Sequence, residues 1–216
     1  MRAPTKKPSG KRPLVLLTGF GPFPGLADNP TGKLVPELAR RGRVEFPAYD
    51  FETEILATVW QAAPPRAAEL HAHHEPALVL HFGVAKSAQG FRIESQARNA
   101  CQLTLDAHGG VPATKIISPG GPHTRPVTIP TRDIISQLQQ RGYPVELSDD
   151  AGDYLCNAVL YHSLNAASAT ASRVPATGFI HIPADLCAGA LSYEAAVAGA
   201  LAIIGVCIAA LPQTKD

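Results

Sequence analysis

Residues 145–167 read VELSDDAGDYLCNAVLYHSLNAA, and the fold prediction starts from this stretch. Val145 to Leu147 form a short run of strand length, a polar turn rich in Asp follows, and Ala151 to Ala167 have the apolar spacing of a helix. A strand that leads directly into a helix is the repeating unit of α/β proteins. The stretch therefore predicts an α/β fold and places Cys156 in the first turns of a helix.

The same alternation extends along the chain. Further strands are predicted where short apolar runs are bounded by Gly, Pro or Ser, and further helices where apolar residues recur every three or four positions. The strands are Leu14 to Leu17, Ala77 to Phe82 and Gly178 to Ile182, and the helices are Thr31 to Arg41, Glu54 to His74, Thr131 to Arg141 and Ser192 to Leu211.

These elements predict one α/β/α sandwich around a mixed, mainly parallel sheet, formed by a single domain over residues 13–216. Residues 1–12 are basic and rich in Pro, so we expect a disordered tail there. Between Lys86 and Pro130 the scattered Gly and Pro residues favour hairpins and loops. The apolar run from Ala195 to Leu211 is interpreted as a buried helix rather than a membrane span, because it lacks aromatic or Arg anchors.

Composition excludes several classes of partner. A net charge of +1 provides no basic field for nucleic acid, and four scattered cysteines match neither a zinc site nor a disulfide scaffold. We therefore expect reduced thiols, a cytoplasmic location, no metal and no cofactor. The expected ligand is a small neutral or weakly charged molecule.

Cys156 is the leading candidate nucleophile, because the partial positive charge at a helix N-terminus favours thiolate. A cysteine nucleophile needs a base and a group that orients the base. His181, near the end of a predicted strand, and Glu94 can fill these roles. Each residue also fits a structural role, as a small core cysteine, a hydrogen-bonded core histidine and an exposed strand charge, and spacing alone does not bring the three together.

Four blocks together resemble the pyroglutamyl peptidase I family, also called pyrrolidone-carboxylate peptidases. They are TGFGPFPGLADNPT from residue 18, HFG at 81–83, SDDAGDYLCN at 148–157 followed by YHSL, and GFIHIP at 178–183. Their order and spacing cover nearly the whole chain from Leu14. The block around Cys156 is the most specific of the four.

The resemblance implies a cysteine peptidase that removes N-terminal pyroglutamyl residues from peptides without a cofactor. It assigns a catalytic triad to Glu94, Cys156 and His181, and it places Phe20 and Phe23 against the two faces of the lactam ring. We add Phe82 and Val84 to the predicted substrate pocket. The resemblance also implies a homodimer or homotetramer.

The sequence departs from the family after Glu94. Thr104 stands where an arginine lining the site is common, the glycine-rich stretch after HFG is replaced by Val84 to Ser87, and Gly110 to Pro130 match poorly. Two alternatives therefore stay open. One is a cysteine hydrolase of another cyclic or acyl amide, and the other is a degenerate homologue that binds N-blocked peptides without cleaving them.

Overall fold

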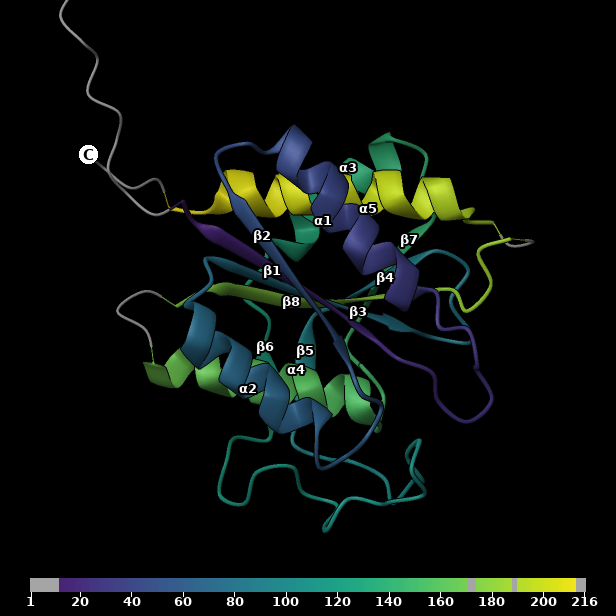
Figure 1. The fold of residues 1–216 in the computed structure, drawn as a ribbon, viewed down its shortest axis with the longest axis vertical. Helices are drawn as coiled ribbons and strands as arrows, with labels where there is room; N and C mark the ends of the chain where they lie inside the picture. Colours follow the sequence, from purple (N-terminus) through teal and green to yellow (C-terminus); the bar gives the residue numbers. More distant parts are fainter. Residues whose placement is uncertain (1–11, 171–173, 188–189, 213–216) are drawn as a thin grey trace, which may run out of the picture.

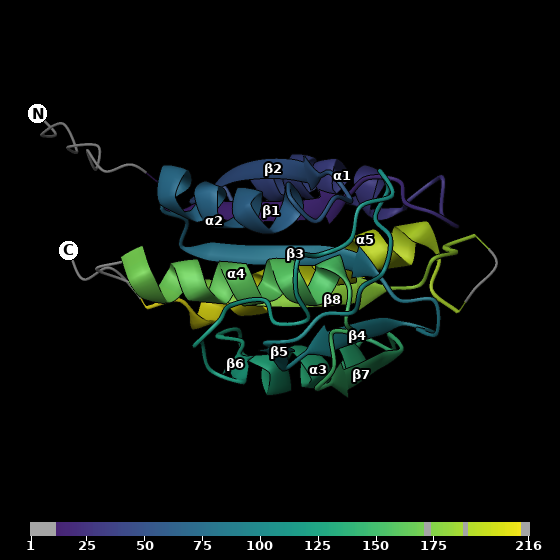
Figure 2. The same ribbon diagram turned by 90° about the horizontal axis from the view of Figure 1, so that it is seen from below.

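A computed structural model of the chain describes residues 12–170, 174–187 and 190–212. A six-stranded sheet lies between two layers of helices (Figure 1, Figure 2). Its strands lie in the order β2-β1-β3-β8-β4-β7. Their bounds are β1 Leu14–Phe20, β2 Asp50–Leu56, β3 Leu78–Val84, β4 Phe91–Glu94, β7 Val145–Ser148 and β8 Ala176–Ile182.

The sheet is mixed, as predicted. β2, β1, β3 and β8 are parallel to one another, whereas β4 pairs antiparallel with β8 and parallel with β7. A separate antiparallel ladder joins β5 (Gln96–Arg98) to β6 (Thr124–Pro126). Because β4 runs antiparallel to β8, Arg92 lies opposite His181, and Glu94 at the end of β4 lies two residues further along, on the same face of the sheet as His181.

The helices form two layers. In Figure 1, α1, α3 and α5 cover one face of the sheet and α2 and α4 cover the other, and α3 and α1 pack against α5 while α2 packs against α4. Their bounds are α1 Thr31–Glu45, α2 Ala63–His74, α3 Thr131–Gln140, α4 Leu155–Thr170 and α5 Tyr193–Ala210. The α/β/α sandwich predicted from the sequence is confirmed.

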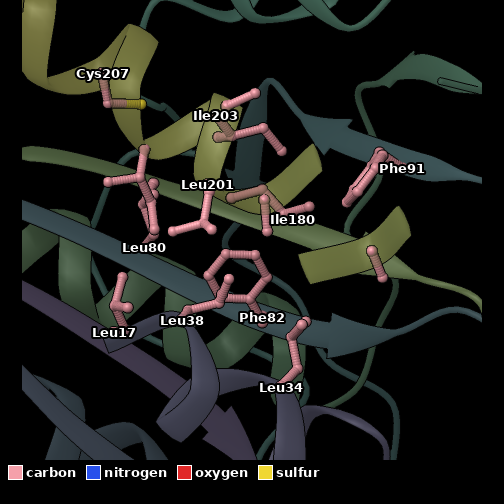
Figure 3. Close-up of a cluster of buried hydrophobic side chains, with 14 of the residues drawn as sticks. Leu17, Leu34, Leu38, Leu80, Phe82, Phe91, Ile180, Leu201, Ile203 and Cys207 are labelled. Carbon is pink, nitrogen blue, oxygen red and sulfur yellow. The ribbon is translucent and has the colours of Figure 1, made fainter. Parts of the chain in front are cut away.

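Each face of the sheet has its own hydrophobic core, because neighbouring strand residues point to opposite sides. On β1, Leu17 faces the cluster under α1 and α5, and Leu16 faces the cluster under α2 and α4. Figure 3 shows the first cluster, in which Leu80, Phe82 and Ile180 meet side chains of α1 and α5. Burying one such leucine contributes about 1.5–3 kcal/mol to folding.

The helix predicted from Glu54 to His74 is wrong in its first half. Glu54 lies in β2, and α2 begins only at Ala63. Pro64 and Pro65 explain the late start, because proline fits the first turn of a helix but not its interior. β2 was missed because it is an edge strand with a largely polar, partly exposed sequence.

The structure also differs from the prediction at the start of α4 and in the placement of β4. α4 begins at Leu155 rather than Ala151, and Gly152 just before it has a φ of 82°, which interrupts the helix and favours glycine. Within the segment from Lys86 to Pro130, the expected hairpins and loops are found as the antiparallel β5–β6 ladder and the loop between its strands, and β4 in addition joins the main sheet. The predicted tail lies, apart from Arg12, outside the described residues.

By length and composition alone, α5 could cross a membrane, although half of this stretch is buried inside the protein. Ser192 caps it by accepting a hydrogen bond from the backbone of Ala195. The helix packs against α1 and α3, and Val197, Ile203 and Ile204 are fully buried. This is the buried C-terminal helix predicted from the sequence.

Candidate active site

The end of β8 and the end of β4 hold a buried pair of titratable side chains. His181 lies one residue before the end of β8, and Glu94 is the last residue of β4. The antiparallel register sets Arg92 opposite His181, so both belong to the same face as Glu94. His181 Nδ1 lies 2.7 Å from Glu94 Oε1, and both residues are buried. The proton therefore lies on Nδ1, and Nε2 is left for another partner.

That partner is Cys156, the second residue of α4. Cys156 and His181 line the same cavity, and the charge of Cys156 raises the pKa of His181. The sulfur packs against Gly83 of β3, the strand residue that pairs with His181. A Cβ atom at residue 83 would lie 3.1 Å from Cys156 Sγ and 2.7 Å from a ring carbon of Phe179, so glycine is needed for this close approach.

The environment of His181 keeps its ring protonated at neutral pH. Burial lowers the pKa of His181, but the charge of Cys156, its hydrogen bond and then Glu94 outweigh burial and raise this pKa to about 9. A protonated imidazole beside a sulfur stabilises a thiolate. The sulfur of Cys156, the imidazole of His181 and the carboxyl group of Glu94 are thus the candidate nucleophile, base and orienting group.

The start of α4 is held firmly against the loop after β5. Asn157 is fully buried, and its side chain accepts from the backbone of Arg98 and donates to the carbonyls of Arg98 and Ala100. Arg98 in turn pairs with Asp150 and Asp153, at 2.6 and 2.7 Å, in the loop that enters α4. The backbone N–H of Cys156 lies in the first helical turn, where N–H groups have no intrahelical acceptor. It is available to an oxyanion.

A cavity of about 260 Å³ opens at this site. Phe20 and Phe23 line it together with Val84, Cys156 and His181. Phe20 packs against Phe179 with ring centroids 6.2 Å apart, and Phe23 packs against Tyr154 at 6.4 Å. Aromatic walls with few polar groups suit a small, flat and uncharged ligand.

The loop that carries Phe23 is fixed by hydrogen bonds to its backbone. Asn29 Nδ2 and Thr58 Oγ1 both donate to the carbonyl of Gly21, at 3.0 and 3.1 Å. Asn29 Oδ1 also accepts from the backbone of Thr31 at the start of α1. The loop is therefore tied both to α1 and to the segment after β2.

Two sequence-predicted positions lie elsewhere. Phe82 is fully buried in the core under α1 and α5, beside Leu34 and Leu38 (Figure 3), and does not line the cavity. Phe82 points to the face covered by α1 and α5, opposite to Gly83, whereas Val84 on the same face as Phe82 reaches the cavity because it is the last residue of β3. Thr104 does not line the cavity either, and its carbonyl accepts from Trp60 Nε1 at 2.8 Å.

Several lining residues were not singled out from the sequence as site residues. They include Asn29, Thr58, Lys86, Arg92, Tyr154 and Leu155. Asn29 lies inside the first block that carried the resemblance, and Tyr154 and Leu155 lie beside the cysteine, so proximity to these blocks was a usable signal. Thr58 follows β2, the strand that the sequence did not reveal.

A chain of buried polar side chains lies on the same side of the sheet. His81 on β3 hydrogen-bonds Thr18 Oγ1 at 2.7 Å and Ser163 Oγ at 2.8 Å, and Ser163 also contacts His71 of α2. Burial lowers the pKa of His71 to about 4, and burial together with the charge of His71 lowers that of His81 to about 3. Both rings are neutral at pH 7. Among the described residues, no group of three or more His, Cys, Asp or Glu could hold a metal ion.

Comparison with known proteins identifies the family of the chain. The model of the pyroglutamyl peptidase family matches residues 13–208. The chain belongs to the pyroglutamyl peptidase family. Among curated relatives, the pyrrolidone-carboxylate peptidase of Halalkalibacterium halodurans is 33% identical over 176 residues, which are 80% of this chain and 84% of the relative. That of Pyrococcus furiosus is 33% identical over 170 residues, which are 78% and 80% of the two chains.

Solved structures of pyroglutamyl peptidases share the fold. A mutant pyrrolidone carboxyl peptidase from Pyrococcus furiosus superposes with a TM-score of 0.83 at 29% identity, covering 92% of this chain and all of that one. Pyroglutamyl peptidase I from Bacillus amyloliquefaciens gives a TM-score of 0.81 at 28% identity, covering 91% and 97% of the two chains. Membership of the pyroglutamyl peptidase family makes this protein a cysteine peptidase.

Proposed function

We propose that this peptidase removes N-terminal pyroglutamyl residues from peptides, with Cys156 as nucleophile, His181 as acid and base, and Glu94 as the group that orients His181. The observation that carries the proposal is the buried 2.7 Å hydrogen bond between His181 Nδ1 and Glu94, on a histidine that lines the same cavity as Cys156. The relatives named above, which are called pyrrolidone-carboxylate peptidases, support the same reaction.

In the first half of the cycle, the Cys156 thiolate attacks the pyroglutamyl carbonyl carbon and forms a C–S bond. The carbonyl oxygen becomes an oxyanion, which accepts a hydrogen bond from the backbone N–H of Cys156. His181 then donates its Nε2 proton to the leaving nitrogen as the C–N bond breaks. The products are a shortened peptide with a free amine and a thioester on Cys156.

In the second half, neutral His181 takes a proton from water, and the oxygen attacks the thioester carbonyl. The C–S bond breaks, free pyroglutamate leaves, and the thiolate and imidazolium return. Glu94 keeps the ring oriented and stabilises its positive charge in both halves, and it does not itself exchange the proton.

Selection of the lactam follows from the walls of the cavity. A pyroglutamyl ring is flat and neutral, so it can lie between Phe20 and Phe23 without a counter-ion. An ordinary N-terminal Glu or Gln would bring an ammonium group into the same space. Burying that charge without a partner would cost several kcal/mol, so free N-termini are rejected.

We further propose that residues 13–216 form one domain and that the enzyme acts in the cytoplasm as a homodimer or homotetramer. Free thiols at Cys101, Cys156, Cys187 and Cys207 support a reducing compartment. Self-association is supported by a group of exposed apolar side chains in the loop between β5 and β6, which are Leu103, Leu105, Val111 and Ile116.

The test measures release of a fluorogenic amine from a pyroglutamyl amide, with the prolyl amide as substrate control. Wild-type protein and Cys187→Ser, which changes an exposed cysteine outside the cavity, should cleave only the pyroglutamyl amide. Cys156→Ser should be inactive while keeping its circular dichroism spectrum. Rapid alkylation of Cys156 without cleavage would indicate another acyl substrate, and slow alkylation would indicate a binder without activity.

A further inference from the structure

The rim of the cavity is charged, although its interior is mostly apolar. Phe20, Ala151 and Leu155 line the cavity and are buried, whereas Lys86 and Asp150 are exposed at the rim and Arg92 is partly exposed. The lactam ring occupies the apolar part, so the residue that follows pyroglutamate must leave past the rim. The charges there can therefore distinguish one leaving residue from another.

Most of these rim charges are already neutralised. Arg92 Nε lies 2.6 Å from Glu146, and Asp150 lies 2.6 Å from Arg98. Lys86 makes no ion pair with any residue that the structure describes. Its ammonium group is thus the rim charge that remains free to bind a substrate.

The position of Lys86 also suits this role. It follows Gly83, which packs against the Cys156 sulfur, by three residues, and the backbone of Ala85 still donates to Ile182 at 3.1 Å. Lys86 lies in the turn that follows β3, where the carbonyl of Ala85 accepts a hydrogen bond from the backbone of Ala88 at 3.1 Å, and Lys86 lines the same cavity as Cys156. Its Nζ lies 3.6 Å from the place that a Cβ atom would take if Gly25 were another residue. The ammonium group therefore lies against the loop that carries Phe23.

We propose that Lys86 is a specificity-determining residue that favours pyroglutamyl peptides with a carboxylate on the residue directly after pyroglutamate. The carboxylate is either an acidic side chain or the C-terminus of a dipeptide, since both place the same group near the rim. The inference rests on the proposed pyroglutamyl peptidase activity and names the substrates on which that activity is greatest. It also gives a role to the segment from Val84 to Ser87, where the chain departs from its family.

The experiment compares kcat/KM for four substrates at low ionic strength: pyroglutamyl-Glu amide, pyroglutamyl-Gln amide, pyroglutamyl-Lys amide and pyroglutamyl-Gln with a free C-terminus. Glu and Gln have the same shape, so their ratio reports charge alone. We expect wild type to prefer the Glu amide about threefold to fivefold over the Gln amide, the range of a partly exposed ion pair. In about 1 M salt the ratio should fall toward one. A gain with the free C-terminus identifies the terminal carboxylate as a second source of the same contact.

Lys86→Met should reduce the ratio of kcat/KM for the Glu amide over the Gln amide to about one. Lys86→Glu should bring this ratio below one and make pyroglutamyl-Lys amide the preferred substrate. Lys115→Met removes an exposed lysine that does not line the cavity and should keep the wild-type ratio. The inference is overturned if wild type prefers the Lys amide, because Asp150 would then set the charge preference at the rim. It is also overturned if Lys86→Met keeps the wild-type preference for the Glu amide over the Gln amide. Cleavage of the Gln amide with a ratio of one overturns only this inference, whereas no cleavage of any pyroglutamyl peptide overturns the proposed function as well.

Discussion

Replacing Gly83 by alanine tests how closely the nucleophile is packed against the sheet. The new Cβ would lie 2.7 Å from a ring carbon of Phe179 and 3.1 Å from Cys156 Sγ, and Phe179 is fully buried. Ordinary contacts begin at 3.4 Å, so the ring must move by about 0.7 Å and the sulfur by at least 0.3 Å. Overpacking of this kind costs about 1–3 kcal/mol.

The activity should fall by more than the stability predicts. A displacement of about 1 Å in a catalytic group can cost a factor of roughly 100, so we expect kcat/KM to fall about tenfold to a hundredfold in Gly83→Ala. Urea denaturation would measure the free energy of unfolding, and a pyroglutamyl amide would measure kcat/KM.

Gly32→Ala is the matched control. Its added Cβ would meet only a backbone oxygen of Phe20 at 3.8 Å, and Gly32 lies in α1. We expect it to be neutral or to stabilise the protein by about 0.4–1 kcal/mol, with activity unchanged. If Gly83→Ala behaved like Gly32→Ala in both assays, the packing of Cys156 against β3 described above would be incorrect.

Three further predictions concern the site and its surroundings. Glu94→Gln should lower kcat/KM at least tenfold and move the alkaline limb of its pH profile to lower pH, because Glu94 adds to Cys156 in raising the pKa of His181 against burial; an unmoved limb would contradict this. His71 and His81 have folded pKa values below the unfolded value of about 6.5, so their stabilisation is full above pH 6.5 and is lost as the pH falls toward about 4. The free energy of unfolding should fall by up to about 2.7 kcal/mol per pH unit in this range, and His81→Gln, measured by urea denaturation, should remove about half of that slope. Asn157→Ala removes three hydrogen bonds at the start of α4 and should cost about 1–3 kcal/mol and lower kcat/KM, while an unchanged melting temperature would refute the bracing role.

Much of this architecture was predictable because its buried strands are continuous apolar runs and its helices are amphipathic or fully apolar. β1, β3 and β8 are buried nearly throughout, and their sequences show it. β2 was not predictable, because it is an edge strand whose residues are mostly partly or fully exposed. Its sequence DFETEIL therefore lacks the continuous apolar run that marks the buried strands. β4 has only four residues, and its place in the sheet depends on pairing with β8 and β7, which no local pattern encodes.

The site shows the same limit. Cys156 could be placed by its own neighbours, because the turn and helix around it are local. Phe82 was assigned to the pocket because it ends a predicted strand, but which of two successive residues faces the site depends on which side α4 covers. Lys86 lines the cavity because it follows the end of β3, and Arg92 lines it because β4 pairs with β8. Neither residue could be assigned to the site from the local sequence.

The pairing of β4 with β8 affects what the chain can do during its synthesis. Glu94 and His181 are 87 positions apart, and β8 lies in the centre of the sheet, between β3 and β4. Contacts of such long range form late, since the intervening chain must first be ordered. A nascent chain that has not yet added residues 176–182 holds Cys156 without the histidine that we propose as its acid and base. Under the proposed mechanism, peptide cleavage therefore requires that β8 has joined the sheet, so a chain still in synthesis should not cleave peptides.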